Sequence, residues 1–208
     1  GATNNLGSVI WSPARVGPTV FEIGYPNRVT DKFRHGDDWW VGDIGPSSTA
    51  PSPIWSKWLE FPFDFPNGPN YVVGQSRWTT DWNFIQPVVV SSTGIYNNSS
   101  STIKFNLASA PGSSAQASLY LGLASDYYCA LVVSVNGINL GSSSGVTATP
   151  NAIPSTGFIP GYSGSDTSIR EGNQAASSDE RITFPASLLH AGANTITFTT
   201  RQVGGSYF

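Results

Sequence analysis

Short runs of alternating apolar and polar residues are the feature that most restricts how this chain can fold. Residues 102–107 and 117–123 alternate in this way, and Ile196 and Phe198 lie between threonines. A period of two places the apolar side chains on one face of a β-strand. No window of the sequence shows a sustained helical period. About eight short strands with polar turns predict an all-β fold, an antiparallel β-sandwich of the jelly-roll type.

Local signals refine this prediction. Strands are also expected at residues 19–23, 71–73, 88–90, 131–135 and 181–184. Asn136-Gly137 predicts a type I′ hairpin, and residues 185–189 predict a single helical turn. The stretch 31–70 contains four tryptophans and six prolines, and the prolines argue there against regular helix or a central strand. A loop of this length inside a compact domain usually has a function.

The length of 208 residues fits one β-rich domain, predicted at residues 19–208 behind an irregular segment at residues 1–18. Charged residues make up 11%, and the net charge of -3 gives no field to attract nucleic acid. No apolar run approaches the roughly 20 residues of a membrane span. Cys129 is the single cysteine, so a disulfide within the chain is impossible. The turn-rich composition is typical of a secreted protein, and we expect a monomer.

One loop concentrates residues suited to binding sugars. Arg77, Trp78, Asp81 and Trp82 lie within six residues, after a predicted strand that Gly74 ends. Indole rings stack on the apolar face of a pyranose, and Arg and Asp side chains form bidentate hydrogen bonds with hydroxyls or carboxylates. The alternative interpretation is that the tryptophans are buried in the core and the charged residues pair with each other.

The sequence also contains candidate sites for modification and for a metal ion. Asn97 and Asn98 each begin an Asn-x-Ser sequon, which suits a glycosylated loop of a secreted protein. A structural calcium ion is compatible with the sequence, and Glu22, Asp31 or Asp179 could contribute oxygen ligands to it. The sequence does not define a ligand set.

Several motifs, in order along the chain, resemble one known domain. They are FEIGYPNR at residues 21–28 with Phe33, WSKW at 55–58, FP at 61–62, YVVG at 71–74, DWNF at 81–84, IR at 169–170 with Gly172, ITFPA at 182–186 with Leu188, and GANTI at 192–196. Together these motifs resemble the C-terminal domain of the rhamnogalacturonan lyases of polysaccharide lyase family 4. The resemblance covers most of residues 20–200.

This resemblance implies a galactose-binding-like jelly roll that acts as a carbohydrate-binding module. In such lyases it follows a catalytic β-sandwich and a small fibronectin-like domain, and the catalytic Lys and His lie in the first domain. No catalytic residue carries over, since none of the lysines and histidines here matches those positions: Lys32, Lys57, Lys104, His35 and His190. We therefore expect a secreted, non-catalytic module that binds pectic, rhamnogalacturonan-type polysaccharide, either free-standing or joined to a catalytic domain. Two alternatives are a domain that only braces a parent enzyme and a module with its own catalytic site.

The candidate binding residues come from loops, because the apolar halves of the strands are needed for the core. Trp39, Trp40 and Trp78 are the predicted stacking residues. Arg77 would supply the cation for a uronate and Asp81 would orient it, with Arg170 as a second cation. Trp55 and Trp82 match family positions, so we expect them to be structural.

Overall fold

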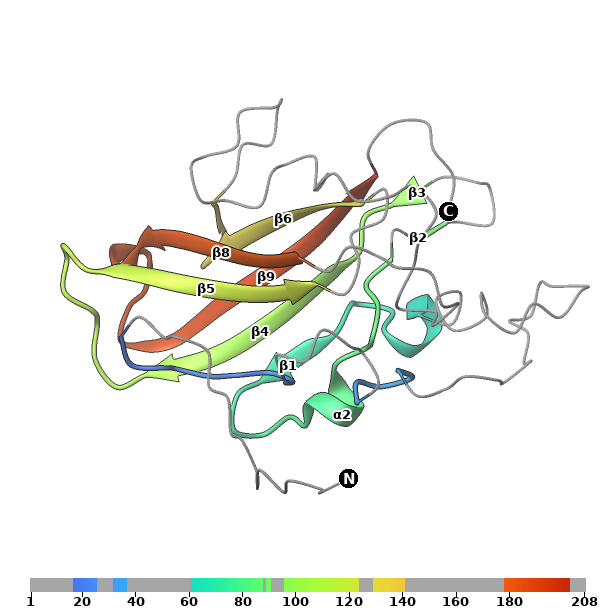
Figure 1. Cartoon of the computed structure of the whole chain (residues 1–208), viewed down its shortest axis with the longest axis horizontal. Helices are drawn as coiled ribbons and strands as arrows, with labels where there is room; N and C mark the ends of the chain where they lie inside the picture. The colour runs from blue at the N-terminus through green and yellow to red at the C-terminus, as the bar shows by residue number, and fades with distance from the viewer. Residues whose placement is uncertain are drawn as a thin grey trace, which may run out of the picture.

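The computed structural model describes residues 17–25, 32–36, 61–87, 89–90, 96–123, 129–140 and 178–202. The described residues form mostly strands, with the pair β5–β8 lying across a larger sheet (Figure 1). In spatial order the larger sheet contains β1 (Asn70–Val72), β4 (Ser100–Leu107), β9 (Gly192–Gln202), β6 (Cys129–Val135) and β7 (Ile138–Asn139). The second sheet pairs β5 (Gln116–Leu123) with β8 (Ser178–Pro185), and β2 (Val89–Val90) pairs with β3 (Tyr96–Asn97). The predicted β-sandwich is confirmed.

The core lies between the two larger sheets because register aligns the apolar positions. Ile103 of β4 is opposite Ile196 of β9, and Leu119 of β5 is opposite Ile182 of β8. All four side chains are buried. The strands are antiparallel except for β1, which runs parallel to β4 and brings Tyr71 beside Ile103. The predicted alternation therefore specifies which face of each strand is buried.

Three local predictions are confirmed. Asn136 and Gly137 both have positive φ, 48° and 81°, as the type I′ turn between β6 and β7 requires. The predicted single helical turn is a 3-10 turn, η2 (Ala186–Leu188). Residues 89–90 form the short strand β2 within the predicted 88–90.

Three local predictions are wrong. Residues 19–23 form no strand, although Phe21 and Ile23 are partly buried against the core. The alternating pattern correctly indicated which side chains of this segment are buried. It does not determine whether a neighbouring strand is present to form backbone hydrogen bonds. Residues 61–64 form a helical turn despite Pro62, since the turn is closed by the N–H of Phe65 donating to Phe61 O at 2.8 Å.

The third wrong prediction is the irregular loop after Gly74. This segment contains a short helix, α2 (Trp78–Asp81), next to β1 (Figure 1). Among the described residues, no helix is long and apolar enough to cross a membrane. Cys129 lies at the start of β6, opposite Gln202.

Candidate functional site

The helix α2 positions the three residues predicted from the loop. The carboxylate of Asp81 accepts the backbone N–H of Arg77 at 2.7 Å, so it closes the first turn of the helix rather than pairing with the guanidinium. The Arg77 side chain is exposed and contacts no acceptor among the described side chains. The pKa of the Tyr71 hydroxyl is raised, first by the burial of Tyr71 and second by the nearby negative charge of Asp81.

Trp78 belongs to an aromatic platform, which we define as Tyr25, Phe33 and Trp78. The Trp78 ring meets Tyr25 edge-on at 5.3 Å between centroids, and it meets Phe33 at 5.1 Å. Trp78 is partly buried and also packs against the core. Tyr25, in contrast, is 67% exposed. The ring that a ligand can reach most easily is therefore Tyr25, with Trp78 supporting it.

Gly24 allows this platform to form. Its φ is +79°, and a Cβ built there would lie 2.5 Å from the Phe33 ring. Only glycine combines this backbone conformation with so close an approach. Trp82 lies at the other end of α2 and meets Tyr71 and Phe198 edge-on, at 6.1 and 6.2 Å. Trp82 is thus part of the core, as expected from the sequence.

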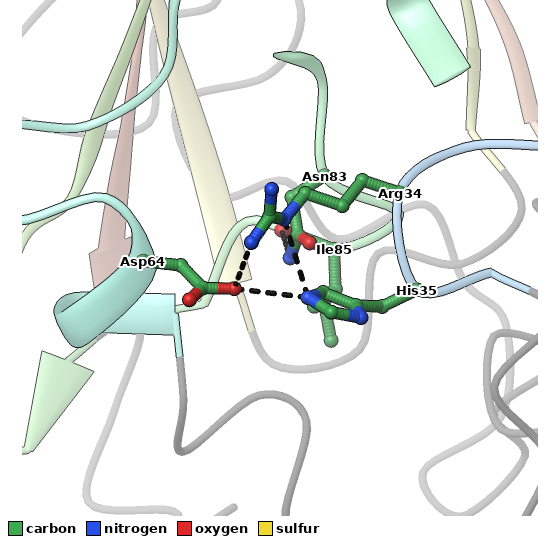
Figure 2. Close-up of polar contacts among 5 residues, drawn as sticks. All are labelled: Arg34, His35, Asp64, Asn83 and Ile85. Atoms are coloured by element: carbon green, nitrogen blue, oxygen red, sulfur yellow. Dashed lines mark hydrogen bonds and ion pairs between the residues drawn. The ribbon is translucent and has the colours of Figure 1, made fainter. Parts of the chain in front are cut away.

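The segment 33–35 also builds a charged group, the Arg34 cluster, which consists of Arg34, His35 and Asp64. The backbone of Arg34 is held by Trp82 and Phe84: its N–H donates to Trp82 O at 3.1 Å, and its carbonyl accepts from Phe84 N at 3.0 Å. Figure 2 shows Arg34 and His35 directed toward Asp64, which stands on the helical turn 61–64. The cluster therefore joins two segments about 30 residues apart in the sequence.

The contacts within the Arg34 cluster converge on one carboxylate oxygen. Asp64 Oδ2 lies 3.0 Å from Arg34 Nη2 and 2.9 Å from His35 Nε2. His35 Nε2 is also 3.2 Å from Arg34 Nε. This nitrogen donates to Asp64 when it carries a proton and accepts from Arg34 when it does not. The Arg34–Asp64 pair is made in either tautomer.

The pairing changes the acidity of Asp64. Burial would raise the pKa of this carboxyl, but the hydrogen bonds from His35 and Arg34, with the positive charge of Arg34, outweigh it and hold the pKa below its ordinary value. The Arg34 guanidinium also lies over the Phe65 ring, 5.5 Å from its centroid. The guanidinium is thus fixed from two sides, while its side chain stays 38% exposed.

Asn83 lies beside this cluster and has an unmatched buried atom. Asn83 is only 6% exposed, and its Nδ2 donates to Ile85 O at 3.0 Å (Figure 2). Its Oδ1 is buried and accepts no hydrogen bond from any described residue. Buried polar atoms of folded proteins nearly always have a partner, so this oxygen marks a place where a donor is expected.

The remaining predicted residues are placed only in part. Trp39, Trp40, Trp55 and Arg170 lie outside the described residues. Asn97 and Asn98 are both exposed, in and after β3. Glu22 is exposed, and Asp31 lies outside the described residues, as does the side chain of Asp179. No three His, Cys, Asp or Glu side chains in the described part of the chain gather as a metal-binding group.

Sequence reasoning missed Tyr25, Phe63 and the partnership of Arg34 with Asp64. A signal existed for Phe63: Phe61 and Phe65 are four residues apart, which is one helical turn, so Phe63 falls on the other side. It is 67% exposed. No local pattern connects Arg34 with Asp64, because the contact is long-range.

The described residues form a β-sandwich with aromatic and charged side chains gathered on its loops. The family described as "CBM-like: Polysaccharide lyase family 4, domain III" matches residues 19–207, and the chain therefore belongs to this family. A curated relative, described as a probable rhamnogalacturonate lyase C of Emericella nidulans, is 30% identical over 88 residues. That match covers 39% of this chain and 8% of the relative.

Proposed function

We propose that this chain is a non-catalytic module that binds pectic, rhamnogalacturonan-type polysaccharide in a secreted, cell-wall-degrading system. Its membership of a carbohydrate-binding-like domain family supports this function, and so does the name of the relative. A catalytic domain of a parent lyase is the expected protein partner. The same family membership favours a second function, that of a brace for the parent enzyme with no ligand of its own.

The observation that carries the binding function is the aromatic platform. Tyr25 offers an exposed ring, and Trp78 holds it by an edge-on contact. An aromatic ring that is fixed by its neighbours loses little entropy when a pyranose stacks on it. Arg77, exposed at the start of α2 and adjacent in sequence to Trp78, supplies a cation for a uronate carboxylate. Trp39, Trp40 and Arg170 remain proposed members of the site, and Asp81 orients Arg77 through its backbone.

The expected affinity is modest. One stacked ring and one arginine contribute about 1–3 kcal/mol each, so together they correspond to dissociation constants from tens of micromolar to tens of millimolar. Affinity electrophoresis in gels containing rhamnogalacturonan measures binding in this range. The chain should be retarded, and Tyr25→Ala should reduce the retardation. Tyr120→Ala is the matched control, since Tyr120 is 60% exposed but lies on β5.

The outcomes distinguish the binding function from the bracing function. Absence of retardation by any pectic polysaccharide would favour the bracing function, and equal losses in the two tyrosine variants would remove the platform from the site. The same chain mixed with rhamnogalacturonan should give no ultraviolet absorbance from unsaturated uronate, as expected for a module with no matched catalytic base.

Glycosylation is a further part of the proposal. Asn97 and Asn98 are both exposed, so either has room for a glycan. Expression through a eukaryotic secretory pathway should add one glycan mass, and replacing both residues by Gln should remove it.

A further inference from the structure

A bound sugar needs donors and acceptors that the protein does not already use, and the Arg34 cluster provides both. Arg34 uses Nη2 for Asp64 and Nε for His35, and its Nη1 has no partner among the described residues. Asp64 binds through Oδ2, so Oδ1 remains an acceptor toward that part of the chain. The two side chains are 38% and 27% exposed. One ion pair at the surface therefore retains both donor and acceptor atoms that the described residues do not use.

A buried oxygen adds to this set. Arg34 and Asn83 are bridged in parallel, and bridged residues project their side chains to the same side. The Asn83 Oδ1 atom, which accepts from no described residue, thus lies on the same side of this bridge as the guanidinium. Because this oxygen is buried, the donor that it would take is an ordered water beneath a bound sugar.

An apolar surface completes the group. Phe63 directly precedes Asp64 on the helical turn 61–64 and is 67% exposed. Phe61 and Phe65 pack together with ring centroids 5.4 Å apart, on the inner side of this turn. The exposed ring is therefore not needed for their packing, and it belongs to the same helical turn as Asp64.

We propose that the Arg34 cluster, with Phe63 and Asn83, is a subsite for the uronic-acid ring of an acidic polysaccharide. Arg34 Nη1 donates to the ring carboxylate, Asp64 Oδ1 accepts from a ring hydroxyl, and Phe63 covers the apolar face. A guanidinium fixed by Asp64 and Phe65 is preorganised for a planar carboxylate. The inference rests on the proposed function, because it names the acidic sugar that the same module recognises through a second subsite.

The test compares two probes: a rhamnogalacturonan oligosaccharide of defined length, and the same oligosaccharide with its carboxylates reduced to primary alcohols. Calorimetric titration of the full chain should give a preference of about tenfold or more for the acidic probe, because a hydrogen bond to a charged group has that value. Arg34→Gln should reduce the preference, and Arg77 accounts for any part that remains. Arg181→Gln, which changes an exposed arginine of β8, should keep the full preference.

Two further measurements prevent an unfolded variant from imitating the result. Thermal unfolding of Arg34→Gln establishes that the variant is folded, and Phe63→Ala leaves the Arg34–Asp64 pair in place. Phe63→Ala should weaken both probes by similar factors and preserve the acidic preference. If Arg34→Gln keeps the preference, or if Phe63→Ala binds both probes as the parent does, the subsite is wrong. Failure of the parent chain to bind either probe would instead overturn the proposed function.

Discussion

Asn136 Nδ2 donates to Asn194 Oδ1 at 2.9 Å and thereby joins the β6–β7 turn to the start of β9. Asn194 is 1% exposed, and its Oδ1 also accepts from His190 N at 3.0 Å. Its Nδ2 donates to His190 O and Gly192 O, at 2.8 and 3.0 Å. All the bonding capacity of this amide is used to close the turn before β9. The GANTI motif therefore has a structural role.

Replacing Asn194 by Ala should destabilise the fold strongly. The substitution leaves partly buried N–H and C=O groups of the turn without partners, and each such group costs up to about 1–3 kcal/mol. We expect a loss of about 2–4 kcal/mol in the free energy of unfolding, measured by urea titration. Asn106→Ala, at an exposed position of β4, is the control and should change stability little. Equal effects of the two substitutions would contradict the role of this network.

Replacing each of three glycines with positive φ by Ala should destabilise the fold to a degree set by the atoms that the new Cβ contacts. Gly74 has φ +82° and open space around it, so Gly74→Ala should cost only the backbone strain, about 1 kcal/mol. Gly24→Ala should cost more, since the new Cβ presses on the Phe33 ring. Gly68→Ala should be the worst, because the Cβ meets the backbone carbonyl of Ser100, which has no freedom to move aside. Thermal unfolding of the three variants gives the order, and Gly74→Ala as the least stable would contradict it.

The strands were predictable because alternation reports burial directly. Ile103 and Ile196 were expected on an inner face and are opposite each other in the core. The Asn136-Gly137 turn was predictable because few residues tolerate positive φ twice in succession. Residues 19–23 show the limit of this reasoning: Phe21 packs on Phe105 at 5.3 Å, but burial does not create a sheet partner.

The candidate site was less predictable, because its contacts are long-range. Trp78 and Arg77 were found from their clustering, but Trp78 was expected on an open loop and instead supports Tyr25. The pairing of Arg34 with Asp64 depends on how segment 32–36 docks beside Trp82 and Phe84, which no local pattern in the sequence encodes.

The ion pair of Asp64 should make a small part of the stability depend on pH. The pKa of the folded carboxyl lies below its ordinary value of about 3.9, so the contribution is present above that value and is lost as the pH falls through the folded pKa. Asp64→Asn should therefore lower stability near pH 6 by under about 1 kcal/mol, since the pair is partly exposed. The difference should become smaller near pH 2, roughly two units below that value.

Arg34→Gln provides the partner measurement for this prediction. It should cause a similar loss near pH 6, roughly two units above the ordinary carboxyl pKa, and the double variant should add little to either single change. Urea unfolding at both pH values measures all three variants. A stability difference between the parent and Asp64→Asn that stays constant with pH would show that this carboxylate does not titrate as a paired group.

Tyr25 and Trp78 should separate binding from stability, although their rings are in contact. Trp78 is partly buried against the core, so Trp78→Ala should lower the free energy of unfolding by about 2 kcal/mol or more and weaken binding together with it. Tyr25→Ala removes a ring that is 67% exposed and should leave the melting temperature nearly unchanged while it reduces retention by rhamnogalacturonan. Trp78→Phe keeps an aromatic ring beneath Tyr25 and should recover part of both losses. Thermal unfolding and affinity electrophoresis measure the two properties on the same samples. If Trp78→Ala binds as the parent does while Tyr25→Ala does not, Trp78 does not support the binding ring, and the platform reduces to Tyr25 alone.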